Sequence, residues 1–517
     1  MHRIESFIRG EWRKGDGAAR ALRDATTGDV VAELAALQID GRAVLGHARD
    51  VGSLALGKLT FHERAGALKA LAKYLSERKQ ELYTLSSATG ATRTDSALDI
   101  EGGLGVLFSY ASRALRELPN DRVYVEGASE ALSKAGEFVG QHLCVSRPGA
   151  CVQINAFNFP VWGMLEKFAP AFMAGSAVIV KPATATAFVT ELAVRQMIQS
   201  NQLPEGTVQL ICGGIGDLFD HLSCQDSVAF TGSAATAQML RSDLGLIANA
   251  TRFTAETDSL NACILGPDAG PGTPEFDLFI KEIVREMMFK AGQRCTAIRR
   301  AIVPKRYLDA ASDALRAAFA DIVIGDPRRE EVKMGPLVGI EQREDVLARI
   351  AHLRSEAELL TGDPTSPDPV GADVSKGAFL RATLLYCRNP YESDAVHSVE
   401  AFGPVCTLMP YDDIQDAVTI ANLGNGSLAC SVFTADMANA RTLVTNLAPY
   451  HGRVLVVNDS VAKHSTGHGS PLPGLIHGGP GRAGGGEELG GLRAVLHCMQ
   501  RTAVQGSPQT IGALVNA

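Results

Sequence analysis

The stretch CVQINAFNFPVWGMLEKFAPAFMAGSAVIVKPA (151–183) decides the fold of this chain. It alternates apolar segments of strand length with an apolar segment of helix length, and the pattern continues beyond it. Strands are expected at 151–157, 176–183, 208–214 and 227–233, and helices at 161–175 and 187–200. Strands that alternate with helices of about 10–15 residues predict βαβ units and a parallel sheet.

The segments on either side of this repeat extend the picture. Residues 41–90 have the apolar spacing of helices, and residues 136–149 alternate like a strand or ribbon outside the main sheet. A second helix–strand unit is expected from residue 265 to VLVVN (454–458). The segment 467–491 is too rich in Gly and Pro to predict regular structure.

Composition limits the classes of function. The chain has 517 residues, 46% of them hydrophobic and 21% charged, which predicts a soluble protein of two or three packed units. Its net charge of −8 favours neither a nucleic-acid nor an anionic-membrane partner. No signal peptide or membrane span is predicted. The ten cysteines contain no C-x-x-C pair, so neither a disulfide framework nor a metal site is expected, and the cytoplasm is the predicted location.

Three residues are candidates for chemistry. Cys295, in AGQRCTA, lies between a helix and a strand, where its thiol could attack a carbonyl, although most lone cysteines are buried apolar groups. Glu256, in FTAETDSLN, is either a solvated loop carboxylate or a buried base that activates water. Asn158, in NAFNFP, is either a turn residue or a donor to a developing oxyanion.

The ends of the predicted strands supply candidate coenzyme contacts. Ligands bind beyond the carboxyl ends of parallel strands, where Lys181, Gly232 and Ser233 are expected. The last two begin a helix, whose free N–H groups suit a pyrophosphate. GPGRAG (479–484) fits G-x-G-x-x-G but lacks the strand–helix context of a dinucleotide fingerprint. His464 and His468 lie in a Ser/Gly loop, which argues against a metal site.

Taken in order, these motifs resemble the aldehyde dehydrogenase superfamily over nearly the whole chain. The motifs are NFP (158–160), KPA (181–183), FTGS (230–233), Glu256, GQRC (292–295) and EAFGP (400–404). The resemblance implies that Cys295 forms a thiohemiacetal, whose oxyanion is held by Asn158 and the Cys295 N–H. It implies that Glu256 activates the water that hydrolyses the later thioester. Glu400 and Phe402 would position the nicotinamide ribose and ring, and Glu488 would relay the released proton.

Departures from the family pattern bear on the coenzyme. Many NAD-preferring members have a glutamate three residues after the lysine, where it binds the ribose 2′-hydroxyl, and this chain has Thr184 there. Loss of that carboxylate removes repulsion against a 2′-phosphate, while Lys181 remains to attract it. NADP is therefore expected, with NAD less favoured. Thr257, Asp258 and Ser259 replace the usual Leu-Gly-Gly after Glu256.

The tail is similar to that of enzymes that oxidise CoA-linked ring-cleavage semialdehydes of benzoate and phenylacetate degradation. The similarity lies in residues 464–491 and in the ending HCMQRTAVQGSP (497–508). The chain ends at Ala517 without the hydratase-type domain of the phenylacetate enzymes, so the expected substrate is 3,4-dehydroadipyl-CoA semialdehyde. The phenylacetate-pathway alternative is 3-oxo-5,6-dehydrosuberyl-CoA semialdehyde. A CoA-acylating dehydrogenase and a non-catalytic structural homologue are the alternatives of another class.

The resemblance also predicts the domains of an α/β aldehyde dehydrogenase fold. A Rossmann-like coenzyme domain is expected at 1–125 and 148–264, and an α/β catalytic domain at 265–478. A β-ribbon oligomerisation element and tail are expected at 126–147 and 479–517, with residues 492–504 as its C-terminal strand. A strand edge that pairs with a second subunit predicts a homodimer.

Overall fold

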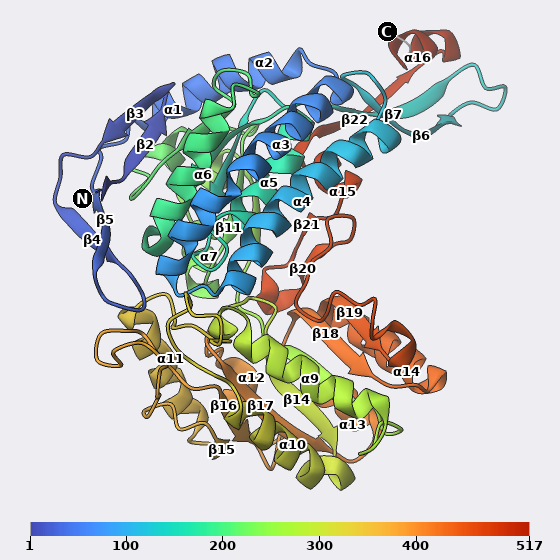
Figure 1. The fold of residues 1–517 in the computed structure, drawn as a ribbon. Coiled ribbons are helices and arrows are strands. Elements are labelled where there is room, and N and C mark those ends of the chain that lie inside the picture. Colours follow the sequence, from blue (N-terminus) through green and yellow to red (C-terminus); the bar gives the residue numbers. More distant parts are fainter. Residues whose placement is uncertain (1, 516–517) are drawn as a thin grey trace.

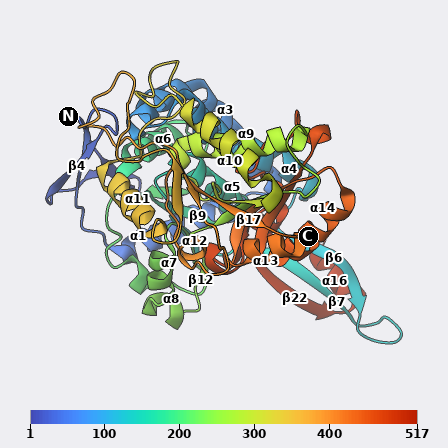
Figure 2. The same ribbon diagram turned by 90° about the horizontal axis from the view of Figure 1, so that it is seen from below.

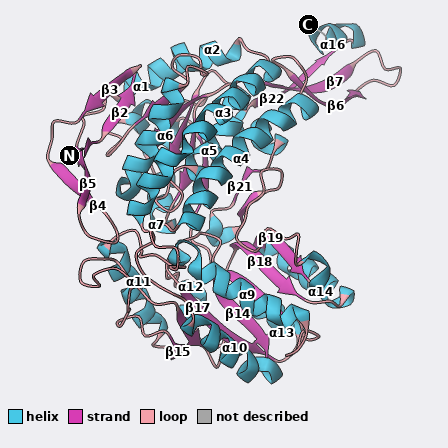
Figure 3. Cartoon of the chain, in the orientation of Figure 1, coloured by secondary structure: helices cyan, strands magenta, loops and turns pink. Residues whose placement is uncertain are grey.

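A seven-stranded sheet forms in the N-terminal half, because its central strands are apolar on both faces (Figures 1 and 3). The computed structural model describes residues 2–515, apart from the side chains of 487–489 and 515. Five strands are parallel, and the last two are antiparallel additions at one edge. In order across the sheet they are β12 (Arg252–Glu256), β11 (Ser227–Thr231), β8 (Ala150–Ile154), β9 (Ala177–Lys181), β10 (Val208–Leu210), β2 (Glu5–Ile8) and β3 (Glu11–Lys14).

Helices cover both faces of this sheet. Val178 and Val180 point into one apolar core and Ala177 and Ile179 into the other, as the period-two geometry of a strand requires. The helices of the first face are α3 (Phe61–Ser86), α4 (Arg93–Glu117), α5 (Trp162–Ala174) and α6 (Ala187–Gln199). Those that pack on the second face are α1 (Gly41–His47), α7 (Ala234–Arg241) and α8 (Leu244–Ala248). Helix α2 (Leu54–Gly57) buries Leu56 in the first core.

A second seven-stranded sheet forms the lower body in Figure 1, and six of its strands are parallel. In order they are β15 (Glu358–Thr361), β16 (Thr383–Tyr386), β17 (Val405–Tyr411), β14 (Ile298–Pro304), β13 (Asn261–Leu265), β18 (Ser427–Phe433) and β19 (His451–Val457). Its helices are α9 (Pro274–Met288), α10 (Leu308–Ala320), α11 (Ile340–Leu353), α12 (Ala395–Ser398), α13 (Ile414–Asn422) and α14 (Met437–Leu447). The expected α/β architecture is confirmed. The chain changes sheets between β12 and β13, a few residues before the expected boundary at 264/265.

A three-stranded antiparallel sheet projects from the body, as Figures 1 and 2 both show. It contains β6 (Tyr124–Ala131), β7 (Val139–Val145) and β22 (Gln500–Gly506), followed by α16 (Pro508–Val515). The expected C-terminal strand is shorter than predicted, because residues 492–498 form helix α15 (Leu492–Cys498). That helix buries Ala494 and Val495 against the core that contains α4 and α5.

Two smaller sheets complete the structure. One contains β1 (His2–Arg3), β5 (Val30–Ala35) and β4 (Ala19–Arg23). The other is a hairpin of β20 (His477–Gly479) and β21 (Gly486–Leu489), within the segment that was predicted to be irregular. Within residues 2–515, no helix has the length and apolar character needed to cross a bilayer.

Candidate active site

The loop that carries Cys295 joins a 3-10 turn, η5 (Phe289–Gly292), to β14. Lys290, Ala291 and Gly292 have φ values of 52°, 49° and 66°, a left-handed run that ordinary side chains disfavour. An added Cβ at Gly292 would lie 2.3 Å from the Gly403 carbonyl oxygen, so the position requires glycine. The backbone of the three residues that precede the Cys295 loop is therefore strained, and contact with the segment at Gly403 holds it in this conformation.

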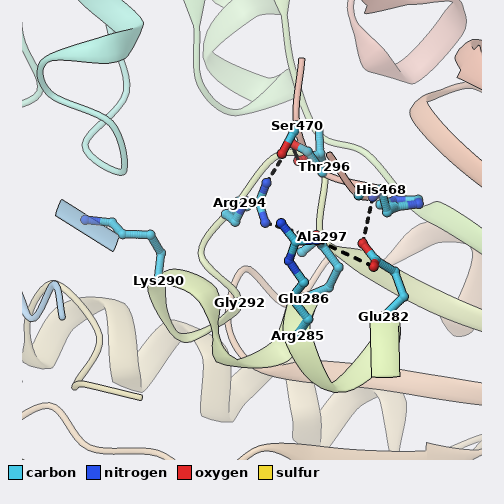
Figure 4. A network of polar contacts seen from close by, with 12 residues as sticks. Glu282, Arg285, Glu286, Lys290, Gly292, Arg294, Thr296, Ala297, His468 and Ser470 are labelled. Atoms are coloured by element: carbon cyan, nitrogen blue, oxygen red, sulfur yellow. Dashed lines mark hydrogen bonds and ion pairs between the residues drawn. The ribbon is translucent and has the colours of Figure 1, made fainter. Parts of the chain in front are cut away.

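Buried polar contacts hold the residues on both sides of Cys295 (Figure 4). The Arg294 guanidinium donates to Glu286 Oε1 at 2.9 Å and to the Gly469 carbonyl oxygen at 2.6 Å. Thr296 Oγ1 donates to the same carbonyl at 3.0 Å. Helix α9 and the Gly-rich segment therefore clamp the loop, and Asn261 Nδ2 donates to the Cys295 carbonyl at 2.8 Å.

Three reactive side chains converge beyond the carboxyl end of β12. One ligand atom each of Cys295, Glu256 and His477 lie within 4.8 Å of one another. His477 Nε2 lies 3.2 Å from Glu256 Oε2, and the two side chains are only 6% and 3% exposed. The structure therefore brings the predicted nucleophile and the predicted base together and adds a histidine that the sequence motifs did not indicate.

Burial and mutual charge shift the pKa values of all three side chains in this cluster. Burial, followed by the Glu256 carboxylate, raises the pKa of the Cys295 thiol well above its ordinary value. Burial is the largest single influence on Glu256 and would raise its pKa, but His477, Lys167 and the hydrogen bond from Cys295 together outweigh burial and lower that pKa. Burial is likewise the largest single influence on His477 and would lower its pKa, but Glu256 and Glu166 together outweigh it and raise that pKa. These shifts favour a carboxylate at Glu256, a protonated imidazole at His477 and a neutral thiol at Cys295.

A small pocket of about 40 Å³ surrounds the sulfur. Asn158 lines it from the turn between β8 and α5, and is itself 6% exposed. Glu166, on α5, lines the same pocket, and burial raises the pKa of its carboxyl. Glu166 was missed in the sequence, although a Glu-Lys pair inside an otherwise apolar helix was a visible signal.

A larger cleft of about 400 Å³ opens on the other side of Cys295. Five predicted coenzyme contacts line it, from the carboxyl ends of strands and from the segment before β17. They are Lys181, Gly232, Ser233, Glu400 and Phe402. The sixth, Thr184, begins the turn η3 (Thr184–Thr186), one residue beyond Ala183 in the cleft wall.

The cleft contains polar groups that suit a nucleotide. Glu400 Oε1 is buried with no hydrogen-bond partner among the described residues, and burial raises the pKa of this carboxyl to about 7 although Arg299 is nearby. Glu400 Oε1 lies 3.7 Å from Arg299 Nε but accepts no hydrogen bond from the residues that the structure describes, so a donor such as a ribose hydroxyl would satisfy it. Phe402 packs edge-on against Phe157, with ring centroids 5.7 Å apart. Burial lowers the pKa of Lys181, which lines the same cleft.

Asp258 changes the expected phosphate site at the start of α7. Its Oδ1 accepts from the Ala234 N–H at 2.9 Å, so one donor of that helix end is already engaged. Arg482 lies 3.9 Å from the same carboxylate and offsets part of its charge. The side chain of Glu488, the predicted proton relay, lies outside the described residues.

The family that this fold and pocket define is shown by comparison with known proteins. The aldehyde dehydrogenase family model matches residues 12–501, so the chain belongs to the aldehyde dehydrogenase family. The protein is an oxidoreductase that acts on aldehydes, and members of this family use NAD or NADP.

Individual relatives agree with this assignment. The chain is 43% identical to a 3,4-dehydroadipyl-CoA semialdehyde dehydrogenase of Aromatoleum evansii, over 92% of this chain and 93% of that one. Among solved structures, a putative aldehyde dehydrogenase from Burkholderia cenocepacia matches with a TM-score of 0.85 and 23% identity, covering 98% of this chain and 97% of that one. A betaine aldehyde dehydrogenase from Staphylococcus aureus, solved with NAD⁺, has a TM-score of 0.85 and 22% identity over the same shares.

Proposed function

We propose that this protein oxidises 3,4-dehydroadipyl-CoA semialdehyde to the CoA-linked acid, with NADP as the hydride acceptor. The observation that carries the proposal is the 43% identity over 92% of the chain to an Aromatoleum evansii enzyme of that name. The chemistry rests on Cys295 and Glu256, which share one pocket next to the coenzyme cleft.

Acylation begins when the Cys295 sulfur attacks the aldehyde carbon. The thiol proton passes to Glu256, whose carboxylate accepts a hydrogen bond from it. The Asn158 amide and the Cys295 N–H donate to the resulting oxyanion. A coenzyme held in the cleft would accept hydride from the thiohemiacetal carbon. A thioester on Cys295 remains.

Deacylation needs a water molecule made nucleophilic inside a small pocket. Glu256 first releases the thiol proton to solvent, and its carboxylate then takes a proton from the water as the water oxygen attacks the thioester carbonyl. The Cys295 thiolate leaves and takes that proton back from Glu256, which restores the thiol and the carboxylate. A buried carboxylate beside the sulfur favours this hydrolytic ending over transfer to free CoA, which needs no deacylating base. It also argues against a non-catalytic structural role.

A CoA-linked substrate is supported by the surface next to the pocket. A second hollow shares Trp162, Glu166, Pro471 and His477 with the first and continues along apolar side chains. Those side chains are Val106, Tyr110, Leu472, Pro473 and Leu475. Arg113 lies against Gly474 beside this hollow, and its guanidinium is paired with Glu117 at 2.9 Å, so a partly neutralised cation accompanies the apolar side chains. A pantetheine arm with a phosphorylated end has matching chemistry.

The NADP preference is supported by the absence of a carboxylate at Thr184 and by two cations, Lys181 and Arg349, in the cleft wall. Asp345 opposes Arg349 across 3.4 Å and moderates that attraction. We also propose that the projecting sheet pairs with a second subunit to form a homodimer, because its outer strands β6 and β22 expose their edges.

The test is a steady-state assay of CoA-linked and free semialdehydes with NADP and NAD in parallel, with and without free CoA. The expected result is the highest kcat/KM with 3,4-dehydroadipyl-CoA semialdehyde and NADP. The expected product is the CoA-linked acid, in which the aldehyde has become a free carboxylate. Equal kcat/KM with NAD contradicts the coenzyme assignment. A higher kcat/KM for the phenylacetate-type CoA semialdehyde, or no turnover of any CoA-linked aldehyde, contradicts the substrate assignment.

A further inference from the structure

His477 has an unusual position for a residue in a Gly-rich hairpin. It begins β20, and its ring reaches the cluster of Cys295 and Glu256 rather than solvent. The strand is held closely, because the Gly478 carbonyl oxygen would lie only 1.6 Å from an added Cβ at Gly452 in β19. The backbone therefore fixes where the imidazole points.

Glu256 is in surroundings that oppose its charge. Its side chain is 3% exposed, and transfer from water to such a site favours the neutral acid. The carboxyl of Glu166 on α5 opposes it further, while Lys167 on the same helix favours it. Of the described groups that shift Glu256, His477 has the largest favourable effect, through its charge and then its hydrogen bond.

The groups around His477 itself explain why it can take this role. Glu256 on β12 and Glu166 on α5 favour its charged form, whereas Arg453 on β19 opposes it. The two carboxyl groups raise the pKa of His477 by more than Arg453 and burial lower it. The imidazole is therefore easier to protonate than a free histidine. A phenylalanine at this position would leave Glu256 without its main counter-charge.

We propose that His477 is a positioning residue that keeps the carboxylate of Glu256 ionised and oriented toward the sulfur of Cys295. The inference rests on the proposed role of Glu256 as the base. Below the pKa of His477, the imidazolium supplies the counter-charge. Above it, the neutral ring can still donate a hydrogen bond from Nε2 to the Glu256 carboxylate. The carboxylate therefore keeps a favourable partner in both charge states of His477.

Removal of the imidazole is expected to raise the pKa of Glu256, because burial is then no longer offset by His477. In His477→Phe, burial dominates and Glu256 takes up a proton as the pH falls, so it can no longer activate water. His477→Gln keeps a neutral donor and loses the charge, and its Glu256 is expected to titrate at an intermediate pH. His464→Phe removes an exposed histidine from the same tail and is the matched control.

The experiment measures the ionisation of Glu256 and its consequence separately. Infrared difference spectra against the matching Glu256→Gln proteins identify a protonated Glu256 carboxyl during a pH titration of each purified protein. p-Nitrophenyl acetate then acylates Cys295 without coenzyme, and its steady-state hydrolysis after the burst reports deacylation. In His477→Phe we expect the carboxylic acid band to be present at neutral pH. We expect deacylation to fall about tenfold for each pH unit below the new midpoint.

Each outcome has one meaning. The acid band absent from wild type and His464→Phe but present in His477→Phe, with His477→Gln between them, supports the proposal. The band absent from all four proteins, or present in wild type, overturns it, and His477→Gln decides the matter if His477→Phe does not fold. If the band behaves as expected while Glu256→Gln deacylates at the wild-type rate, then the proposed function of Glu256 fails and the role of His477 in its ionisation stands.

Discussion

Replacement of Glu256 by glutamine separates the two halves of the proposed reaction. Glutamine has the same shape, so the pocket around Cys295 keeps its packing, but its amide cannot take a proton from water. A positioned general base contributes about 10²–10⁴-fold in rate. We expect kcat to fall by that factor, which corresponds to about 3–5 kcal/mol in the barrier. Acylation in the variant passes the thiol proton to solvent instead of to Glu256, and hydride transfer needs no activated water. The first turnover therefore remains while the later hydrolysis is slow.

The assay follows absorbance of the reduced coenzyme after rapid mixing with the aldehyde. Glu256→Gln is expected to give a burst of one reduced coenzyme per active site, followed by slow turnover. A second readout comes from the thiol, because the Glu256 carboxylate raises the pKa of Cys295. Its removal lowers that pKa, so iodoacetamide should alkylate Cys295 faster at fixed pH. A kcat within about twofold of wild type with no burst refutes the reasoning.

Four further results are expected. Asn158→Ala should lower kcat about 10²–10³-fold by removing an oxyanion donor, with coenzyme affinity in titrations unchanged. Glu400 has a pKa raised to about 7, so the KM for coenzyme should rise as the pH falls through 7. Glu400→Gln should flatten that dependence, and a KM that still changes with pH in the variant counts against Glu400 as the ribose acceptor. Gly292→Ala should cost about 1–3 kcal/mol of unfolding free energy, or more through the contact with Gly403, as measured by denaturant titration. Thr184→Glu should raise the KM for NADP more than that for NAD, and equal effects would contradict the charge argument.

Much of the fold could be predicted from the sequence, because parallel strands are buried on both faces and read as short apolar runs between helices. Helix α3 begins at Phe61 for reasons visible in the chain, since Thr60 and Glu63 form a capping box. Residues 492–498 were harder. Their apolar and polar residues fit either a strand or a short helix, and only packing against the core with α4 and α5 decides for the helix.

The site was predictable where residues follow strand ends and unpredictable where distant loops meet. Glu256 and Lys181 end β12 and β9, so the parallel sheet brings them to one edge. His477 comes from a hairpin more than 200 residues later, and nothing local indicates that its ring faces Glu256. Asp258 is another case, because its contact with the Ala234 N–H depends on how β12 and α7 meet.

The central claim is that the sulfur of Cys295 carries the substrate during the reaction. The most direct measurement is peptide mapping by mass spectrometry after acid quench of the enzyme mixed with aldehyde and NADP. We expect an acyl group on the peptide that contains Cys295, at higher occupancy in Glu256→Gln. An acyl group on one of the other nine cysteines, or turnover without any acylated peptide in Glu256→Gln, would contradict it.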